Sequence, residues 1–160
     1  MARREHRYAT TVSWTGNHGE GTASYSAYSR AHTIMASGKP SIAGSADPAV
    51  MGDRARYNPE ELLVASLSAC HMLWYLHLCA NAGIRVQAYE DAAEGLMAME
   101  ADGGGTFSEV VLRPRILIAD RDGEQRAREL HQGAHELCFI ARSVNFPVRC
   151  EPTVLVEPGG

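Results

Sequence analysis

The sequence predicts an α+β protein, with antiparallel sheets packed on two helices in the order βββ-α-ββ-α-β. Three observations predict this class. Short segments of alternating apolar and polar residues are separated by glycine-rich turns, as in antiparallel sheets. Two longer segments begin with helix-capping residues. The 160 residues contain no internal repeat and no low-complexity linker, so we expect a single domain over residues 1–160.

Six segments have the alternation and composition of β-strands. A loop over residues 38–57, rich in glycine, proline and small polar residues, separates the first three from the rest, and long loops are often functional. The fourth and fifth flank an Asp-Gly-Gly-Gly turn at residues 102–105 and form a predicted hairpin. The six segments are residues 6–14, 22–29, 31–36, 84–99, 107–119 and 147–156.

The first predicted helix has a well-marked start. Asn58 suits the N-cap, Pro59 suits the first helical position, and Glu61 completes a capping box. The helix continues to about Asn81 and stops at Gly83, a residue that favours helix ends. Its middle is apolar on nearly all sides, so we expect it to be buried at the centre of a domain or of a dimer.

A second helix is predicted over residues 122–142, with Asp122 as its cap. His131 and His135 lie four residues apart on one face, and Cys138 follows at the next turn. A zinc site of these three residues with Cys70 as fourth ligand is chemically possible. We favour the alternative that the two histidines are merely solvated, because zinc usually takes more closely spaced ligand pairs. No metal is therefore expected.

Charge and hydropathy exclude several classes of function. The net charge of −4 provides no basic surface for nucleic acid or anionic lipid. The charged N-terminus, Met1–His6, leads into no apolar segment, so no signal peptide is expected. The most apolar segment, residues 62–80, is interrupted by two serines and two histidines, and no membrane span is expected. These features predict a cytoplasmic protein.

The four cysteines are Cys70, Cys79, Cys138 and Cys150. None forms a C-x-x-C pair, which argues against a thioredoxin-like motif or a zinc ribbon. Each, taken alone, is more often a small core residue than a nucleophile. At about 100° per residue, Cys70 and Cys79 face opposite sides of the first helix and cannot share a site within one chain. We interpret Cys79 and Cys150 as structural.

Two segments together resemble the signatures of the OsmC/Ohr family (osmotically inducible protein C and organic hydroperoxide resistance protein). The first is Tyr-Asn-Pro-Glu-Glu-Leu-Leu-Val-Ala-Ser-Leu-Ser-Ala-Cys-His at residues 57–71. The second is Ala-His-Glu-Leu-Cys at residues 134–138, followed by Arg-Ser-Val at residues 142–144. The spacing and element order also match, and the resemblance covers nearly the whole chain, as in a divergent OsmC-like member.

The resemblance implies an antioxidant, stress-response peroxidase that reduces organic hydroperoxides without a cofactor. It implies that Cys70 is the peroxidatic cysteine, that Cys138 is the resolving cysteine, and that Glu60 belongs to the site. It also implies an arginine that holds the peroxidatic sulfur as thiolate, an intertwined homodimer, and a dithiol reductant such as a lipoylated protein. The apolar side chains of Met72, Leu73 and Trp74 favour an organic peroxide over hydrogen peroxide.

The sequence departs from the family pattern in two places. The first glycine-rich turn, residues 16–21, lacks the arginine that Ohr-type members carry there, which leaves Arg30, Arg54 and Arg56 as candidates. We rank Arg30 first, since predicted strand sequence holds a side chain more rigidly than a mobile loop, and Arg56 second. The residue after the second signature cysteine is commonly proline, and here it is Phe139.

Helix geometry adds a reason to expect the homodimer, given the shared site of Glu60 and Cys70 that the resemblance implies. Glu60 and Cys70 are ten residues apart, or about 15 Å along one helix, which a glutamate side chain cannot span. If both belong to one site, Glu60 must come from a partner subunit across an obligate interface of more than about 2,000 Å². The alternatives are a non-catalytic module that binds a small ligand and the His/Cys metal protein described above.

Overall fold

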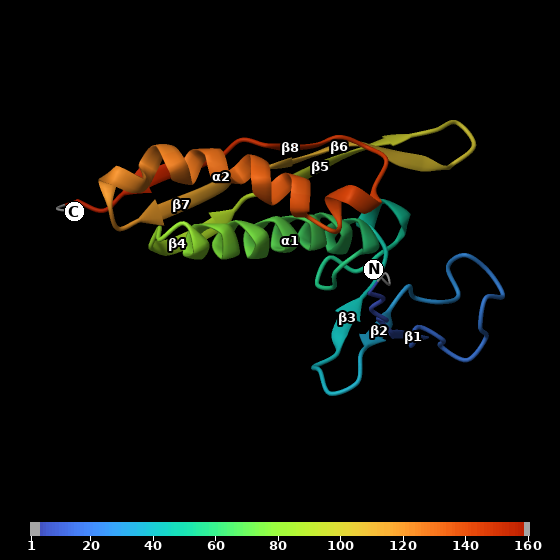
Figure 1. The fold of residues 1–160 in the computed structure, drawn as a ribbon. Helices are drawn as coiled ribbons and strands as arrows, with labels where there is room; N and C mark the ends of the chain where they lie inside the picture. Colours follow the sequence, from blue (N-terminus) through green and yellow to red (C-terminus); the bar gives the residue numbers. More distant parts are fainter. Residues whose placement is uncertain (1–3, 159–160) are drawn as a thin grey trace. The chain divides into compact units, whose positions relative to one another are not determined.

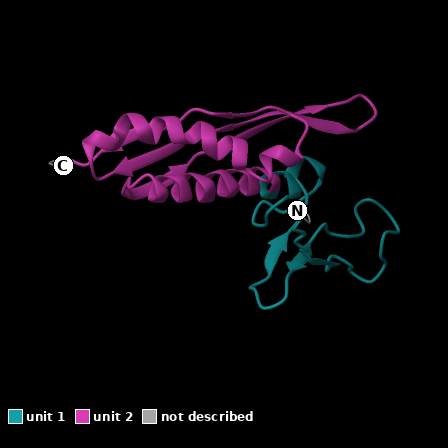
Figure 2. Ribbon diagram, viewed as in Figure 1, with its two compact units in different colours: residues 1–62 teal, residues 63–160 magenta. Residues whose placement is uncertain are grey.

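The computed structural model describes residues 4–158 and contains two compact units, one ending at Leu62 and the other beginning at Leu63 (Figure 2). The boundary falls inside the first helix, so both units share a continuous element. The elements follow the predicted α+β class, with three strands before the first helix and the remaining strands and the second helix after it (Figure 1).

The N-terminal unit is built on an antiparallel sheet of β1 (Thr11–Trp14), β2 (His32–Met35) and β3 (Ile42–Gly44). A short 3₁₀ turn, η1 (Pro48–Val50), follows the sheet. In the register of β2 and β3, His32 lies opposite Gly44. A Cβ atom on Gly44 would come within 2.2 Å of the His32 ring, so glycine is needed where the ring crosses the strand.

Two strand predictions in this unit are wrong. Residues 22–29 form no strand, because Tyr28 pairs only through an isolated bridge with Asn17. The Asn17 Oδ1 atom accepts hydrogen bonds from two following backbone N–H groups, which winds the chain into a loop. In contrast, β3 lies inside residues 38–57, which were predicted to be loop, and it forms because β2 offers a free edge.

The first helix is confirmed as α1 (Pro59–Asn81). The Asn58 Oδ1 atom accepts the Glu61 backbone N–H at 2.7 Å, and the Glu61 carboxylate accepts the Asn58 backbone N–H at 3.1 Å, which is the predicted capping box. Gly83 follows the helix with a φ of +71°, a backbone conformation that suits glycine. Local sequence is therefore sufficient to define both ends of α1.

Burial on α1 follows one stripe. Its buried residues are spaced four apart: Leu67, His71, Tyr75 and Cys79. The opposite side is open in the single chain, where Leu73 is 64% exposed. Within residues 4–158, α1 is the one helix whose length and apolar composition would suffice to span a bilayer. The serines and histidines within it therefore do not by themselves exclude a membrane span. Core helices of soluble proteins share this property, and the buried stripe of α1 packs on protein.

The second unit contains two three-stranded sheets. The first has the order β4 (Val86–Asp91), β7 (Pro114–Ile118), β9 (Thr153–Val156), and the second has the order β5 (Glu94–Met99), β6 (Gly105–Leu112), β8 (Val148–Cys150).

Each of the last three predicted strands is interrupted and supplies one strand to each sheet. Two of the interruptions lie beside Pro114 and Pro152, which lack the N–H that would continue the ladder. The sheets were predicted to be antiparallel, and each also contains one parallel pair, because β8 and β9 run parallel to β6 and β7.

The second helix is shorter than predicted. It is α2 (Glu124–Leu137), and Asp122 lies in the preceding 3₁₀ turn η2 (Arg121–Gly123) instead of capping it. The helix ends at Cys138, whose backbone is extended, and the chain continues through the 3₁₀ turn η3 (Ala141–Ser143). Cys138 therefore lies at the helix terminus, where its backbone turns away from the helix axis.

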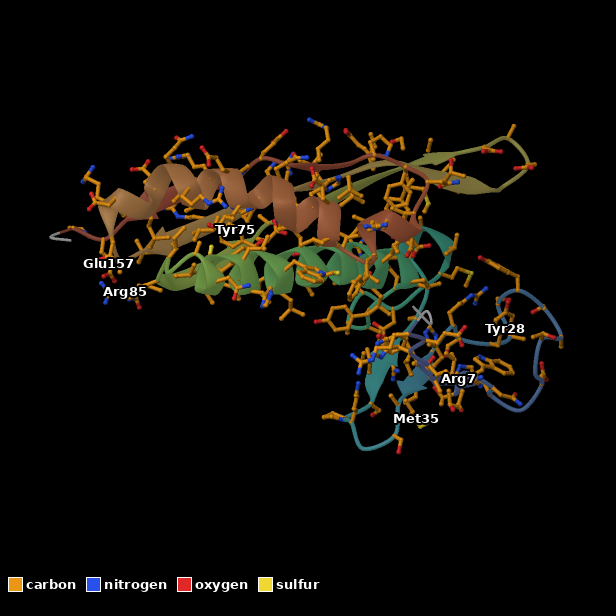
Figure 3. All side chains as sticks on the ribbon, in the orientation of Figure 1. Arg7, Tyr28, Met35, Tyr75, Arg85 and Glu157 are labelled. Atoms are coloured by element: carbon orange, nitrogen blue, oxygen red, sulfur yellow. The ribbon has the colours of Figure 1, made fainter. Side chains whose placement is uncertain are left out.

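The core of the second unit lies between the two helices and the β4-β7-β9 sheet, and Figure 1 shows α1 and α2 side by side along these strands. Tyr75, labelled in Figure 3, stacks on the His131 ring of α2 with the ring centroids 3.9 Å apart. The other buried members of this cluster are Cys79, Ile116, Ile118, Ala127, Leu130, Ala134 and Val154.

The capping box makes a testable contribution to stability. Replacing Asn58 by alanine removes the side-chain acceptor for the Glu61 N–H and should lower the free energy of unfolding by about 1 kcal/mol, measured by urea denaturation. Asn81→Ala, at the exposed end of the same helix, is the matched control and should change it by less than about 0.5 kcal/mol. Equal effects of the two variants would show that the cap does not define the start of α1.

Candidate functional site

The packing of α1 against α2 brings Cys70 and Cys138 together. Cys70 lies in the middle of α1, one residue before the buried His71, and Cys138 lies where α2 ends. Cys70 lies close enough to Cys138 to raise the pKa of the Cys138 thiol, and both thiols are free. The sequence separates these cysteines by 68 positions, so their proximity depends entirely on the packing of the two helices.

Cys138 lies in a dry environment, with 1% of its surface exposed. Burial raises the pKa of its thiol, and the neighbouring Cys70 raises it further. The backbone N–H of Ala141, 3.4 Å from the Cys138 Sγ atom, acts in the opposite direction but does not cancel these effects. Cys138 is therefore a protonated thiol at neutral pH.

An apolar hollow of about 320 Å³ opens beside Cys70. The Trp74 ring meets Phe139 edge-on at 5.4 Å and His77 edge-on at 5.7 Å, and these contacts hold the wall in place. Of the apolar residues predicted to surround Cys70, Met72 does not line the hollow. The lining residues are Cys70, Leu73, Trp74, His77 and Phe139.

Sequence reasoning missed two of these wall residues. His77 follows Cys70 by seven positions, which places both on one stripe of α1. Phe139 stands directly after Cys138, where the departure from the family pattern was itself a signal. The Phe139 ring forms part of the apolar wall of the hollow, and the smaller side chain of a proline would form less of it.

Arg30 and Glu60 line a different cavity, of about 400 Å³, within the N-terminal unit. The Arg30 guanidinium donates to the carbonyls of Tyr25 and Tyr28, each at 2.7 Å, and lies over both rings at 4.1 and 4.3 Å. The Glu60 Oε2 atom is buried without a hydrogen-bond partner. The cavity thus contains both a held cation and a carboxylate oxygen with spare accepting capacity.

The other candidate arginines lie elsewhere. The Arg56 side chain is 3.5 Å from the Asp53 carboxylate in an ion pair on the same short segment, and Arg54 is exposed. Neither lines the cavity that Glu60 occupies. Of Arg30, Arg54 and Arg56, only Arg30 shares a cavity with Glu60.

The zinc quartet considered from the sequence does not assemble. The His131 Nδ1 atom lies 3.0 Å from the His71 Nε2 atom and 3.8 Å from the Cys150 Sγ atom. Within residues 4–158, the one His, Cys and carboxylate group with converging ligand atoms is His71, His131 and Cys150, without His135, Cys138 or Cys70. His131 takes these partners because the stripe containing His71 and Tyr75 packs directly on α2.

The fold and the thiol pair define a class: an α+β protein with two adjacent free cysteines at a helix–helix contact, one of them beside an apolar hollow. The family described as OsmC-like protein matches residues 52–153. The chain belongs to this family. No curated protein matches the chain.

Solved structures of the family share the fold. An OsmC-like protein of unknown function from Vibrio cholerae is 34% identical, with a TM-score of 0.84 over 93% of this chain and 100% of that one. An organic hydroperoxide resistance protein from Elizabethkingia anophelis is 19% identical, with a TM-score of 0.65 over 96% and 100% of the two chains. One from Legionella pneumophila is 18% identical, with a TM-score of 0.65 over 94% and 98%.

The four thiols should differ in reactivity. Burial is the first cause of raised thiol pKa values at Cys79 and Cys138, and it also raises the pKa of Cys150, to about 12, with the Asp91 and Glu151 carboxylates adding to the effect. Raised pKa values mean little thiolate at pH 8, so iodoacetamide should label the half-exposed Cys70 first.

Peptide mapping of the reduced protein by mass spectrometry measures this order, and labelling of the other three thiols should increase as the pH rises beyond 9. In urea, where all four thiols are solvated, the rates should become equal. Faster labelling of Cys79 or Cys138 than of Cys70 in the folded protein would contradict the geometry of the site.

Proposed function

We propose that this protein is a thiol peroxidase that reduces organic hydroperoxides in the cytoplasm, with Cys70 as the peroxidatic residue and Cys138 as the resolving residue. The single observation that carries the proposal is the proximity of two free thiols, one of which lines an apolar hollow. Family membership and relatives named organic hydroperoxide resistance proteins support it.

The chemistry follows from the positions of the two sulfurs. The Cys70 thiolate attacks the O–O bond of the hydroperoxide and takes its terminal oxygen, while the other oxygen leaves as an alkoxide and collects a proton to become an alcohol. Cys70 is then a sulfenic acid. The Cys138 sulfur attacks it, water leaves, and a Cys70–Cys138 disulfide forms. A dithiol reductant, such as a lipoylated protein, restores both thiols by exchange and is itself oxidised to a disulfide.

The peroxidase chemistry requires Cys70 as a thiolate, and a cation beside the sulfur would favour that charged form. Arg30 is our candidate. Its guanidinium has five N–H donors, of which two are used on the carbonyls of Tyr25 and Tyr28, and the remaining donors are free to meet a thiolate or a carboxylate. Glu60, with its unpartnered carboxylate oxygen in the same cavity, would position that guanidinium.

The active form in this proposal is a homodimer. Ten residues separate Glu60 from Cys70 on α1, so Glu60 of the partner subunit would complete each site. The open side of α1 fits this arrangement, because an antiparallel α1 pair would cover Leu73, which is 64% exposed in the single chain. Phe139, at 63% exposure beside the Cys70 hollow, would be covered as well.

Turnover assays test the peroxidase directly. With a lipoyl dithiol as reductant, cumene hydroperoxide should be reduced faster than hydrogen peroxide, because the hollow beside Cys70 is apolar. Cys70→Ser should lower turnover by at least about 1,000-fold, as expected when the nucleophile is removed. Cys138→Ser should lose turnover with the dithiol yet still consume one equivalent of peroxide.

Cys79→Ser is the matched control, since Cys79 lies on the same helix away from the thiol pair, and it should retain activity. Undiminished turnover by Cys70→Ser would remove the peroxidase proposal and leave a module that binds apolar ligands without chemistry. Loss of activity in a folded Cys79→Ser variant would show that the wrong pair has been chosen.

The dimer has its own test. Sedimentation velocity at micromolar concentration should show two copies, and Ala65→Arg, which puts a charge on the open side of α1, should shift the protein towards monomer and lower its activity. Gln87→Arg, on an exposed position of β4, adds the same charge elsewhere and should leave the dimer intact. A stable and fully active monomer would contradict the shared site.

A further inference from the structure

The second unit also contains a cluster of reactive side chains that the proposed peroxidase chemistry does not use. It consists of His71 on α1, His131 on α2 and Cys150 at the end of β8. The His71 Nε2 atom lies 3.0 Å from the His131 Nδ1 atom and 3.5 Å from the Cys150 Sγ atom, and the third side of the triangle is 3.8 Å. Three separate elements therefore direct one ligand atom each toward a common point.

These separations are those of ligands around one soft metal ion. With metal–nitrogen distances of about 2.0–2.1 Å and a metal–sulfur distance of about 2.3 Å, ligand atoms in tetrahedral or trigonal geometry lie about 3.3–3.8 Å apart. The two distances to the sulfur fall in this range. The distance between the nitrogens is shorter by a few tenths of an ångström, which a small rotation of either imidazole corrects.

The two histidines are almost fully buried, with 1% of His71 and 4% of His131 exposed. They share one hydrogen bond, which leaves the His71 Nδ1 and His131 Nε2 atoms buried without partners. Burial also lowers the imidazole pKa values, to about 4 for His71 and about 3 for His131, so both rings are neutral and keep lone pairs for a ligand. Burying two imidazoles that each keep one unpartnered nitrogen is destabilising, so stability alone does not explain the cluster.

The cluster also has access to solvent. A cavity of about 610 Å³ is lined by His131 and Cys150, and the polar side chains of His135 and Glu151 stand along its wall. Water from this cavity could occupy a fourth coordination position. Cys150 is half-buried, so its sulfur marks the place where the cluster meets the cavity.

We propose that the His71 Nε2, His131 Nδ1 and Cys150 Sγ atoms form a binding site for a thiophilic d¹⁰ metal ion, Zn²⁺ or Cu⁺. Two imidazoles and one thiolate are the ligand types that these ions prefer. On binding, Cys150 releases its thiol proton to solvent and becomes a thiolate ligand. The imidazole that donates the hydrogen bond between the rings changes tautomer, so that its proton moves to its other, unpartnered nitrogen and both ligand nitrogens offer lone pairs. No electron transfer is required. The bound ion would link β8 to α1 and α2, the two helices that position the Cys70–Cys138 pair.

Titration of the reduced, chelator-treated protein against a competing chromophoric chelator tests the site, with Zn²⁺ and Cu⁺ in separate arms. One ion should bind per chain and raise the melting temperature, and the arm with the tighter binding identifies the ion. Co²⁺ should give the near-ultraviolet thiolate charge-transfer band and the visible bands of a tetrahedral site. Cys150→Ser should abolish the charge-transfer band and weaken binding by at least about 100-fold, since loss of an outer-shell group alone costs 10–100-fold.

Two controls keep the outcome interpretable. His135→Asn, on the next turn of α2 beside the cavity, should bind as the unaltered protein does, whereas His131→Asn should lose the site. The double variant Cys70→Ser/Cys138→Ser, which lacks the thiol pair, should still bind one ion, so this result does not depend on the peroxidase proposal. Failure of either ion to bind the unaltered protein, or undiminished binding by folded Cys150→Ser and His131→Asn variants, would overturn the site.

Discussion

The structure depends on the burial of one stripe of α1 against α2 and the two sheets of the second unit. Leu67, His71, Tyr75 and Cys79 recur every four residues, so they form a continuous surface on a straight helix. The stacking of Tyr75 on His131 fixes the position of α2 along α1. Because Cys138 lies about two helical turns beyond His131, and Cys70 directly precedes His71, the same contact sets the separation of the two thiols.

This packing gives neighbouring residues on α1 different environments. Cys70 lies at the edge of the stripe and opens into a hollow walled by Trp74 and Phe139, where a peroxide can reach it. His71 turns inward, where burial keeps its imidazole neutral and sets it against His131 and Cys150. A substitution that shifts α1 by a fraction of a turn would therefore disturb the thiol pair and the histidine pair together.

The features predicted correctly from sequence are those that depend on local chemistry. The capping box at Asn58 and the left-handed Gly83 define α1 without help from the rest of the fold. The strand boundaries failed because they depend on partners: Pro114 interrupts a segment whose alternation is otherwise continuous, and β3 forms only because β2 has a free edge. Because 68 positions separate Cys70 from Cys138, no local pattern pairs them, and only the family resemblance singled them out.

The contact of His71 with Cys150, 79 positions away, has no signature in the sequence around either residue, so only the structure could identify it.

One measurement tests directly whether helix packing makes Cys70 and Cys138 a redox pair. The reduced protein is treated with one equivalent of cumene hydroperoxide, quenched with acid, and mapped by mass spectrometry without reduction. We expect a single intramolecular Cys70–Cys138 disulfide, with Cys79 and Cys150 still reduced. A Cys70 sulfenic acid that persists unresolved, or a disulfide to either of the other cysteines, would contradict it.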